Sequence, residues 1–142
     1  MMPSISGYFL LRHIDTGGFG NVYQAVSLRD RRNVAIKMLN RTDVKSMGQF
    51  VREAKILSRH INNKFVCSIL DYNFRTSIPY IVLEYCDSGS LRNWVKERKD
   101  WRSVAAILTH VIQGLTGIHR AGGFHRYNGA GISDRWICYN IG

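Results

Sequence analysis

Apolar and polar residues alternate on both sides of a glycine-rich turn near the start of the chain. Alternation with a period of two is typical of half-buried strands, because successive side chains point to opposite faces of a sheet. We therefore predict two strands that form a hairpin through Gly17-Gly18-Phe19-Gly20. The alternating positions are Tyr8, Leu10 and Arg12 before the turn, and Val22, Gln24 and Val26 after it.

A third strand and then a helix are predicted after the hairpin. The apolar run Val34-Ala35-Ile36-Lys37 indicates a strand that ends in a cation. From Val44 to Arg59 apolar residues recur at helical spacing, and Glu53 falls on their face of the helix. A carboxylate on an apolar face is often only an accident of an interface, but Lys37 is available here as a partner. The apolar positions of the helix are Met47, Phe50, Val51, Ala54 and Leu57.

Two more strands and two more helices follow in the pattern. The runs Phe65 to Leu70 and Ile78 to Tyr85 predict strands separated by a turn around Asn73 to Ser77, which completes a five-stranded antiparallel sheet. Ser90 to Lys99 predicts a short basic helix with Ser90 as its N-cap. A longer helix is predicted next, with apolar positions at Val104, Leu108, Val111, Ile112, Leu115 and Ile118 and a stop at Gly122-Gly123.

Composition indicates a globular protein without a membrane span. The 142 residues are 45% hydrophobic and 21% charged with only two prolines, which argues against disorder. The longest uncharged run, Ser103 to Ile118, falls short of the roughly 18 apolar residues that a span requires. The first residues lack the pattern of a secretory signal. Cys67, Cys86 and Cys138 form no CxxC pair, so we expect neither a disulfide framework nor a zinc site, and a reducing cytoplasm fits best.

The formal charge of +10 raises nucleic acid as a partner, since Lys and Arg neutralise phosphates. The positive residues are scattered and match no recognition motif, so a solvated surface is the better interpretation. They include Arg29, Arg31, Arg32, Arg41, Lys45, Arg92, Lys96, Arg98, Lys99 and Arg102.

The glycine-rich turn and Lys37 together suggest a site for phosphate. Glycine allows backbone amides to approach an anion closely, and Lys37 would face that anion from the third strand. A glycine-rich turn alone is weak evidence, because most such turns are ordinary hairpin loops. Here the order is glycine turn, Val22-Tyr23, Ala25 and Val34-Ala35-Ile36-Lys37. Over about residues 7 to 126 this order resembles that of protein kinases.

The resemblance implies an α+β fold and an ATP site. Residues of about 7–85 would form a protein-kinase-like amino-terminal lobe, a five-stranded antiparallel sheet plus one helix, and 86–142 the hinge and an incomplete carboxyl-terminal lobe. In the family the lysine of the third strand pairs with a glutamate of the following helix and contacts the nucleotide phosphates. Leu83 would line the adenine pocket, the backbone of Glu84 and Cys86 would bind the base, and Ser90 would reach the ribose. The implied nucleotide-binding residues are Ile14, Gly17, Gly18, Phe19, Gly20, Val22, Ala35, Lys37, Glu53, Leu83, Glu84, Cys86 and Ser90.

The resemblance fails abruptly after Arg126. The segment before it resembles the start of the kinase catalytic loop, but the aspartate that acts as base is replaced by Tyr127. Magnesium is expected of the family, but its ligands are missing, and the chain stops before the Asp-Phe-Gly motif. Asp15 replaces the first loop glycine and would repel phosphates. The other replaced loop positions are Gly129 for lysine, Ala130 for proline and Ile132 for asparagine.

Three interpretations remain open. The first is an interrupted serine/threonine protein kinase that retains an ATP-binding lobe but is inactive. The second is a pseudokinase that serves as a protein-binding or scaffold module, and the third is a basic nucleic-acid-binding protein. Without a packing partner, the helix over 103–120 would expose Val104, Leu108, Val111 and Leu115 and favour self-association or a protein partner.

Overall fold

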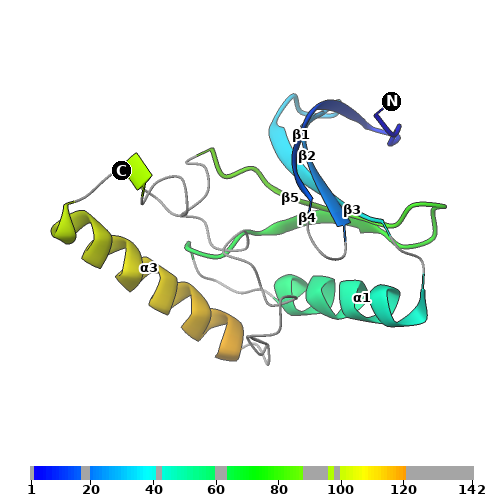
Figure 1. Cartoon of the computed structure of the whole chain (residues 1–142). Coiled ribbons are helices and arrows are strands. Elements are labelled where there is room, and N and C mark those ends of the chain that lie inside the picture. The colour runs from blue at the N-terminus through cyan, green and yellow to red at the C-terminus, as the bar shows by residue number, and fades with distance from the viewer. Residues whose placement is uncertain are drawn as a thin grey trace. The chain divides into compact units, whose positions relative to one another are not determined.

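The computed structural model describes residues 2–16, 20–40, 43–59, 64–87, 96–97 and 100–120. These residues belong to two compact units. The first contains residues 1–55 and 68–85, and the second contains residues 56–67 and 86–142. Figure 1 shows a sheet and a helix, α1, in the first unit and a long helix, α3, in the second.

The first unit contains the predicted five-stranded antiparallel sheet, with strand order β1-β2-β3-β5-β4. Its β1-β2 hairpin flanks the glycine-rich turn, as predicted. The third strand continues through Leu39 and pairs with β2 and β5. The strands are β1 (Tyr8–Thr16), β2 (Gly20–Ser27), β3 (Asn33–Leu39), β4 (Ile69–Asn73) and β5 (Tyr80–Glu84).

One face of the sheet is covered by an apolar core. Adjacent residues on β3 point alternately to this core and to the opposite face, so residues two apart share a face. The core also contains the buried Ile5, which precedes β1, and the half-buried Tyr8 and Tyr23 pack against it. The buried strand residues of the core are Leu10, Ala25, Val34, Ile36, Met38, Tyr80 and Val82.

Two irregularities in β1 correct the predicted alternation. The register of β1 against β2 shifts between Leu10 and Arg12 and again between His13 and Asp15. Leu10 pairs with Ala25 on the core face, whereas Arg12 pairs with Gln24 on the opposite face. The prediction that Leu10 and Arg12 continue one alternation is therefore wrong, because an inserted residue changes which side chains share a face.

The fourth strand also lies later than predicted. It runs from Ile69 to Asn73, so the predicted strand over 65–70 overlaps it at two residues only. Phe65 instead packs against Ile107 of α3 in the second unit. The polar residues of β4 form a strand because their backbone pairs with β5 at Asp71↔Val82 and Tyr72↔Ile81. This edge pairing is not visible in the hydrophobic pattern.

The helix α1 (Val44–Ser58) confirms the predicted helix and lies along the sheet in Figure 1. Asp43 caps it, because the carboxylate accepts hydrogen bonds from the Ser46 backbone N–H at 2.9 Å and from the Ser46 hydroxyl at 2.7 Å. Phe50 is fully buried and meets Phe74 edge to face, with ring centroids 6.0 Å apart. The cap and the buried ring fix which face of α1 meets the sheet.

The second unit contains α3 (Trp101–Arg120), which confirms the predicted long helix. Its inner face packs on Phe65, and the His110 ring stacks on that phenyl ring with centroids 4.3 Å apart. The prediction of an exposed stripe holds for Leu108 but is wrong for three residues, because Phe65 and Ile107 cover them in part. These are Val104, Val111 and Leu115.

Some predictions cannot be compared with the structure. Most of the predicted basic helix over 90–99, and the stop at Gly122-Gly123, lie outside the described residues. Among the described helices, neither the length nor the hydropathy of any one suffices to cross a bilayer.

Candidate functional site

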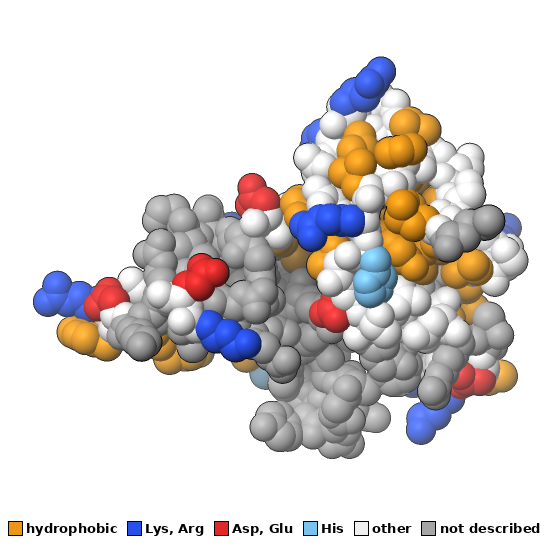
Figure 2. Space-filling view, turned by 45° about the horizontal axis from the view of Figure 1, so that its top comes forward, with side chains coloured by type: hydrophobic (Ala, Val, Ile, Leu, Met, Phe, Trp, Pro, Cys, Tyr) orange, Lys and Arg blue, Asp and Glu red, His pale blue; other side chains and the backbone are white. Residues whose placement is uncertain are grey.

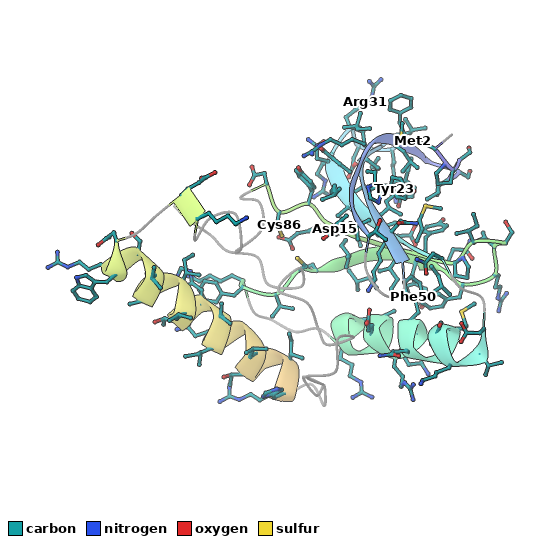
Figure 3. The ribbon with its side chains drawn as sticks, in the orientation of Figure 1. Met2, Asp15, Tyr23, Arg31, Phe50 and Cys86 are labelled. Atoms are coloured by element: carbon teal, nitrogen blue, oxygen red, sulfur yellow. The ribbon has the colours of Figure 1, made fainter. Side chains whose placement is uncertain are left out.

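The candidate site is centred on an ion pair between β3 and α1. The Lys37 ammonium donates a hydrogen bond to Oε2 of Glu53 at 2.8 Å, which confirms the pairing that the family resemblance implied. Only 12% of the Lys37 side chain and 14% of the Glu53 side chain are exposed. The Phe50 ring lies 5.9 Å from the Lys37 nitrogen, and Figure 3 shows Phe50 between α1 and the sheet. A charge pair so shielded from water holds both side chains in one geometry.

Strand pairing places three of the other predicted residues, Val22, Ala35 and Leu83, on the sheet face that carries Lys37. Val22 pairs with Lys37, and directly paired residues share a face of a sheet. Ala35 lies two residues before Lys37 on β3 and pairs with Leu83 of β5, so both share that face as well. Ile14 lies at the second irregularity of β1 and is exposed. The face opposite the core thus presents an apolar floor with one ammonium group.

Gly20 is the first residue of β2, and the close packing of β2 against β3 requires a residue without a side chain at this position. A Cβ atom at this position would collide with the backbone carbonyl oxygen of Met38 on the adjacent strand. The remaining turn residues Gly17, Gly18 and Phe19, together with Ser90, lie outside the described residues. Gly20 therefore supports the geometry of the hairpin independently of any ligand.

The residues at the end of β5 have definite partners. The Glu84 backbone N–H donates to the Ser68 carbonyl at 3.0 Å, and the Glu84 carboxylate accepts from the Ser68 N–H at 3.0 Å. Because the Glu84 N–H is already bonded, the backbone group of Glu84 that could bind a base is its carbonyl, which would accept a hydrogen bond. Cys86 belongs to the second unit, where its sulfur lies 3.2 Å from that of Cys67. The sequence, with 18 residues between the two cysteines, contained no signal for this contact.

A polar cluster that sequence reasoning missed lies on the Lys37 face. The Arg12 Nε donates to the Gln24 side-chain oxygen at 2.8 Å, and its Nη2 donates to the Tyr85 hydroxyl at 3.3 Å. This cluster links β1 and β2 to the residue that follows β5. Only knowledge of the β1 irregularity would have moved Arg12 to this face.

Asp15 also lies on this face, because it pairs with Val22, which in turn pairs with Lys37. Figure 3 labels Asp15 near the end of β1.

Among the described residues, no group of three or more His, Cys, Asp or Glu side chains could hold a metal ion. Tyr127 and the residues around it lie outside the described part of the chain.

Comparison with known proteins identifies this arrangement. The family model of the protein kinase domain matches residues 8–127. The chain belongs to the protein kinase family. Its sheet, the helix α1 and the Lys37–Glu53 pair therefore form part of a protein kinase domain, and the family as a whole uses ATP and magnesium.

Several protein kinases resemble this chain. It is 32% identical over 126 residues to serine/threonine-protein kinase PknL of Mycobacterium tuberculosis, covering 85% of this chain and 31% of PknL. It is 33% identical over 96 residues to serine/threonine-protein kinase ATG1 of Kluyveromyces lactis, covering 66% of this chain and 11% of ATG1. It is 30% identical over 125 residues to MAP3K epsilon protein kinase 1 of Arabidopsis thaliana, covering 84% and 9%. The chain spans less than a third of the length of these relatives.

Proposed function

We propose that this chain binds an adenine nucleotide on the Lys37 face of its sheet. The observation that carries the proposal is the 2.8 Å bond between Lys37 and Glu53. Glu53 holds the ammonium group in place, and the ammonium group is the partner that a phosphate needs. The apolar side chains Val22, Ala35 and Leu83 share this face and would contact the base and sugar, while the turn after β1 would cover the phosphates. The family resemblance also implies Glu84, Cys86 and Ser90 as nucleotide-binding residues.

The nucleotide site is tested by titrating ATP while following the melting temperature. A ligand that binds only the folded state must raise that temperature. Lys37→Ala should weaken ATP binding by about tenfold or more, since a hydrogen bond to a charged group contributes about 1.5–3 kcal/mol. Lys45→Ala serves as control, because it removes the same charge from an exposed position in the first turn of α1.

The single Lys37 variant leaves Glu53 shielded from water without its partner, which costs stability. A double variant, Lys37→Met with Glu53→Met, removes both charges together and separates folding from binding. We expect the double variant to melt cooperatively but to show no ATP-dependent rise in melting temperature. Equal ATP affinity in wild type and double variant would contradict the proposed site.

We further propose that this chain does not transfer the phosphoryl group. The residue after His125-Arg126 is Tyr127, and tyrosine has an ordinary pKa of about 10, which makes it a poor base at neutral pH. Loss of a general base lowers a rate by about 10² to 10⁴. Ile132 stands where the family places a metal-binding asparagine, and an isoleucine side chain has no atom that coordinates magnesium.

The absence of transfer is tested with γ-labelled ATP and a mixture of serine- and threonine-containing proteins. Labelled protein should not exceed that formed by the Lys37→Met, Glu53→Met control. Transfer that depends on Lys37 would contradict the proposal and indicate a serine/threonine kinase activity like that named for the relatives.

A second candidate function is that of a pseudokinase that contacts another protein through α3. The observation that favours it is a row of exposed apolar side chains on this helix, formed by Trp101, Leu108 and Ile112. Such rows promote association. Its test, self-association measured by sedimentation, is argued with the whole molecule below.

A further inference from the structure

Asp15 places a carboxylate on the face of the sheet that carries Lys37. Strand pairing shows this placement, since Asp15 pairs with Val22 and Val22 pairs with Lys37. Two strand spacings separate β1 from β3, so the backbones at Asp15 and Lys37 lie about 10 Å apart. Without the second irregularity of β1, which shifts the register after His13, the pairing that gives Asp15 this position would not form.

The charged groups on this side include a carboxylate that repels phosphate. Lys37 contributes one positive charge, and it already forms an ion pair with Glu53. Asp15 adds a second carboxylate close to the turn that joins β1 to β2. Arg12 shares this face of the sheet, and its guanidinium donates hydrogen bonds to Gln24 and Tyr85. A highly charged anion that contacts Lys37 would be repelled by the negative charge of Asp15.

We propose that Asp15 sets the charge preference of the nucleotide site and disfavours free triphosphate relative to ligands with less negative charge. The inference rests on the proposed nucleotide site and specifies its ligand class. Adenosine, which has no phosphate, binds without this repulsion. ATP in complex with magnesium carries less negative charge than free ATP and is penalised less.

This proposal predicts a graded response to removal of the carboxylate. Asp15→Asn keeps the size and shape of the side chain but abolishes its charge. It should tighten the binding of free ATP by about tenfold at low salt, since a unit charge about 10 Å from a group with several negative charges acts at this scale. The gain should be smaller for ATP with magnesium and absent for adenosine. Because exposed charges are screened, 0.3 M NaCl should reduce the gain for free ATP, with a Debye length of about 6 Å.

The experiment measures dissociation constants by isothermal titration calorimetry for adenosine, ATP with a chelator, and ATP with magnesium chloride. The control is Asp30→Asn, which changes the net charge equally. Asp30 lies in the turn between β2 and β3, roughly 20 Å along β2 from the position that pairs with Asp15. Asp15→Gly is the second variant, and the ligand-free melting temperature of each variant shows whether it is folded.

The outcomes separate the inference from the site on which it rests. A gain for ATP in both Asp15 variants, with adenosine and the Asp30 control unchanged, supports the inference. Unchanged ATP affinity overturns it, as does an equal change for all three ligands or weaker binding of ATP with magnesium. If wild type binds ATP through Lys37 but Asp15→Asn has no effect, the inference alone fails. If no folded variant binds any of the ligands, the nucleotide site itself fails.

Discussion

At the scale of single residues, Glu53 requires a partner for its charge, whereas the position of Gly20 requires the absence of a side chain. Glu53 lies on the apolar face of α1, where a carboxylate is stable only with a partner such as Lys37. Helical spacing predicted the face on which Glu53 lies, and the family resemblance implied Lys37 as its partner. Gly20 could be predicted only as part of a turn. Its actual constraint, the approach of the Met38 carbonyl, depends on how closely two strands pack.

The first prediction therefore concerns Gly20. Gly20→Ala should lower the free energy of unfolding by about 1–3 kcal/mol, because the new methyl group forces β2 away from β3. Gly48→Ala is the control, since a Cβ at Gly48 meets no atom within 4 Å and the residue lies inside α1. It should raise the free energy of unfolding by about 0.5–1 kcal/mol. Urea denaturation of both variants measures the difference, and equal effects would contradict the packing argument.

At the scale of elements, the periodic spacing of apolar residues predicted most strands and both long helices, but it did not predict features that depend on pairing between strands. The strands β1, β2, β3 and β5 and both long helices were predicted because their apolar positions repeat. The irregularities of β1 and the polar strand β4 were not predicted, since they depend on pairing with neighbouring strands.

Asp43 and Asp100 each precede a helix, and each is followed three residues later by a serine that donates a hydrogen bond to its carboxylate. This repeated Asp-x-x-Ser pattern could have set both helix starts more sharply.

The two outermost strands of the sheet meet, which shows that the sheet is strongly curled. β1 and β4 stand at opposite ends of the strand order, yet the Tyr8 hydroxyl donates a hydrogen bond to Asp71 Oδ2 at 3.1 Å. Burial, together with the nearby Asp71 carboxylate, raises the pKa of Tyr8 from 10.0 to about 12. In Figure 2 the outer surface of this unit carries hydrophobic side chains between single Lys and Arg side chains. The bond thus joins the edges of a sheet whose apolar core lies inside the curl.

The second prediction follows from this bond and its pH dependence. The pKa of Tyr8 is higher in the folded chain than in the unfolded chain, so the bond contributes fully below pH 10 and its contribution is lost as the pH rises through 12. Tyr8→Phe should reduce the free energy of unfolding at pH 8 by about 0.5 kcal/mol, near the lower end for an exposed hydrogen bond. The difference between wild type and variant should shrink toward pH 12. Urea midpoints measured from pH 8 to 11.5 check this, and a difference that grows with pH would show that the sign is wrong.

At the scale of the whole molecule, the chain contains two units of different character. The first unit presents a sheet with a charged pair on one face. The described part of the second contains a long helix, whose inner face packs on Phe65 and whose outer face carries the exposed apolar side chains of Trp101, Leu108 and Ile112. The sequence predicted the apolar positions of α3 but could not tell which of them the segment around Phe65 covers, because that segment was assigned to a strand.

The third prediction concerns the outer face of α3. Trp101, Leu108 and Ile112 are 71%, 52% and 63% exposed, and spacings of seven and four residues place them on one side of the helix. We expect the chain to self-associate through them, with a sedimentation coefficient that rises with protein concentration. Leu108→Glu combined with Ile112→Glu should abolish this rise, because burying new carboxylates between two helices is costly.

Gln113→Glu is the matched control for the α3 prediction, since Gln113 is exposed on the same helix and the substitution adds a charge without removing an apolar side chain. It should leave the concentration dependence unchanged. If the control disrupts association as strongly as the double variant, then net charge and not the apolar row governs it. A wild-type chain that remains monomeric at every concentration would argue against a protein-binding role for α3. The nucleotide site on the first unit is tested separately by the Lys37 variants.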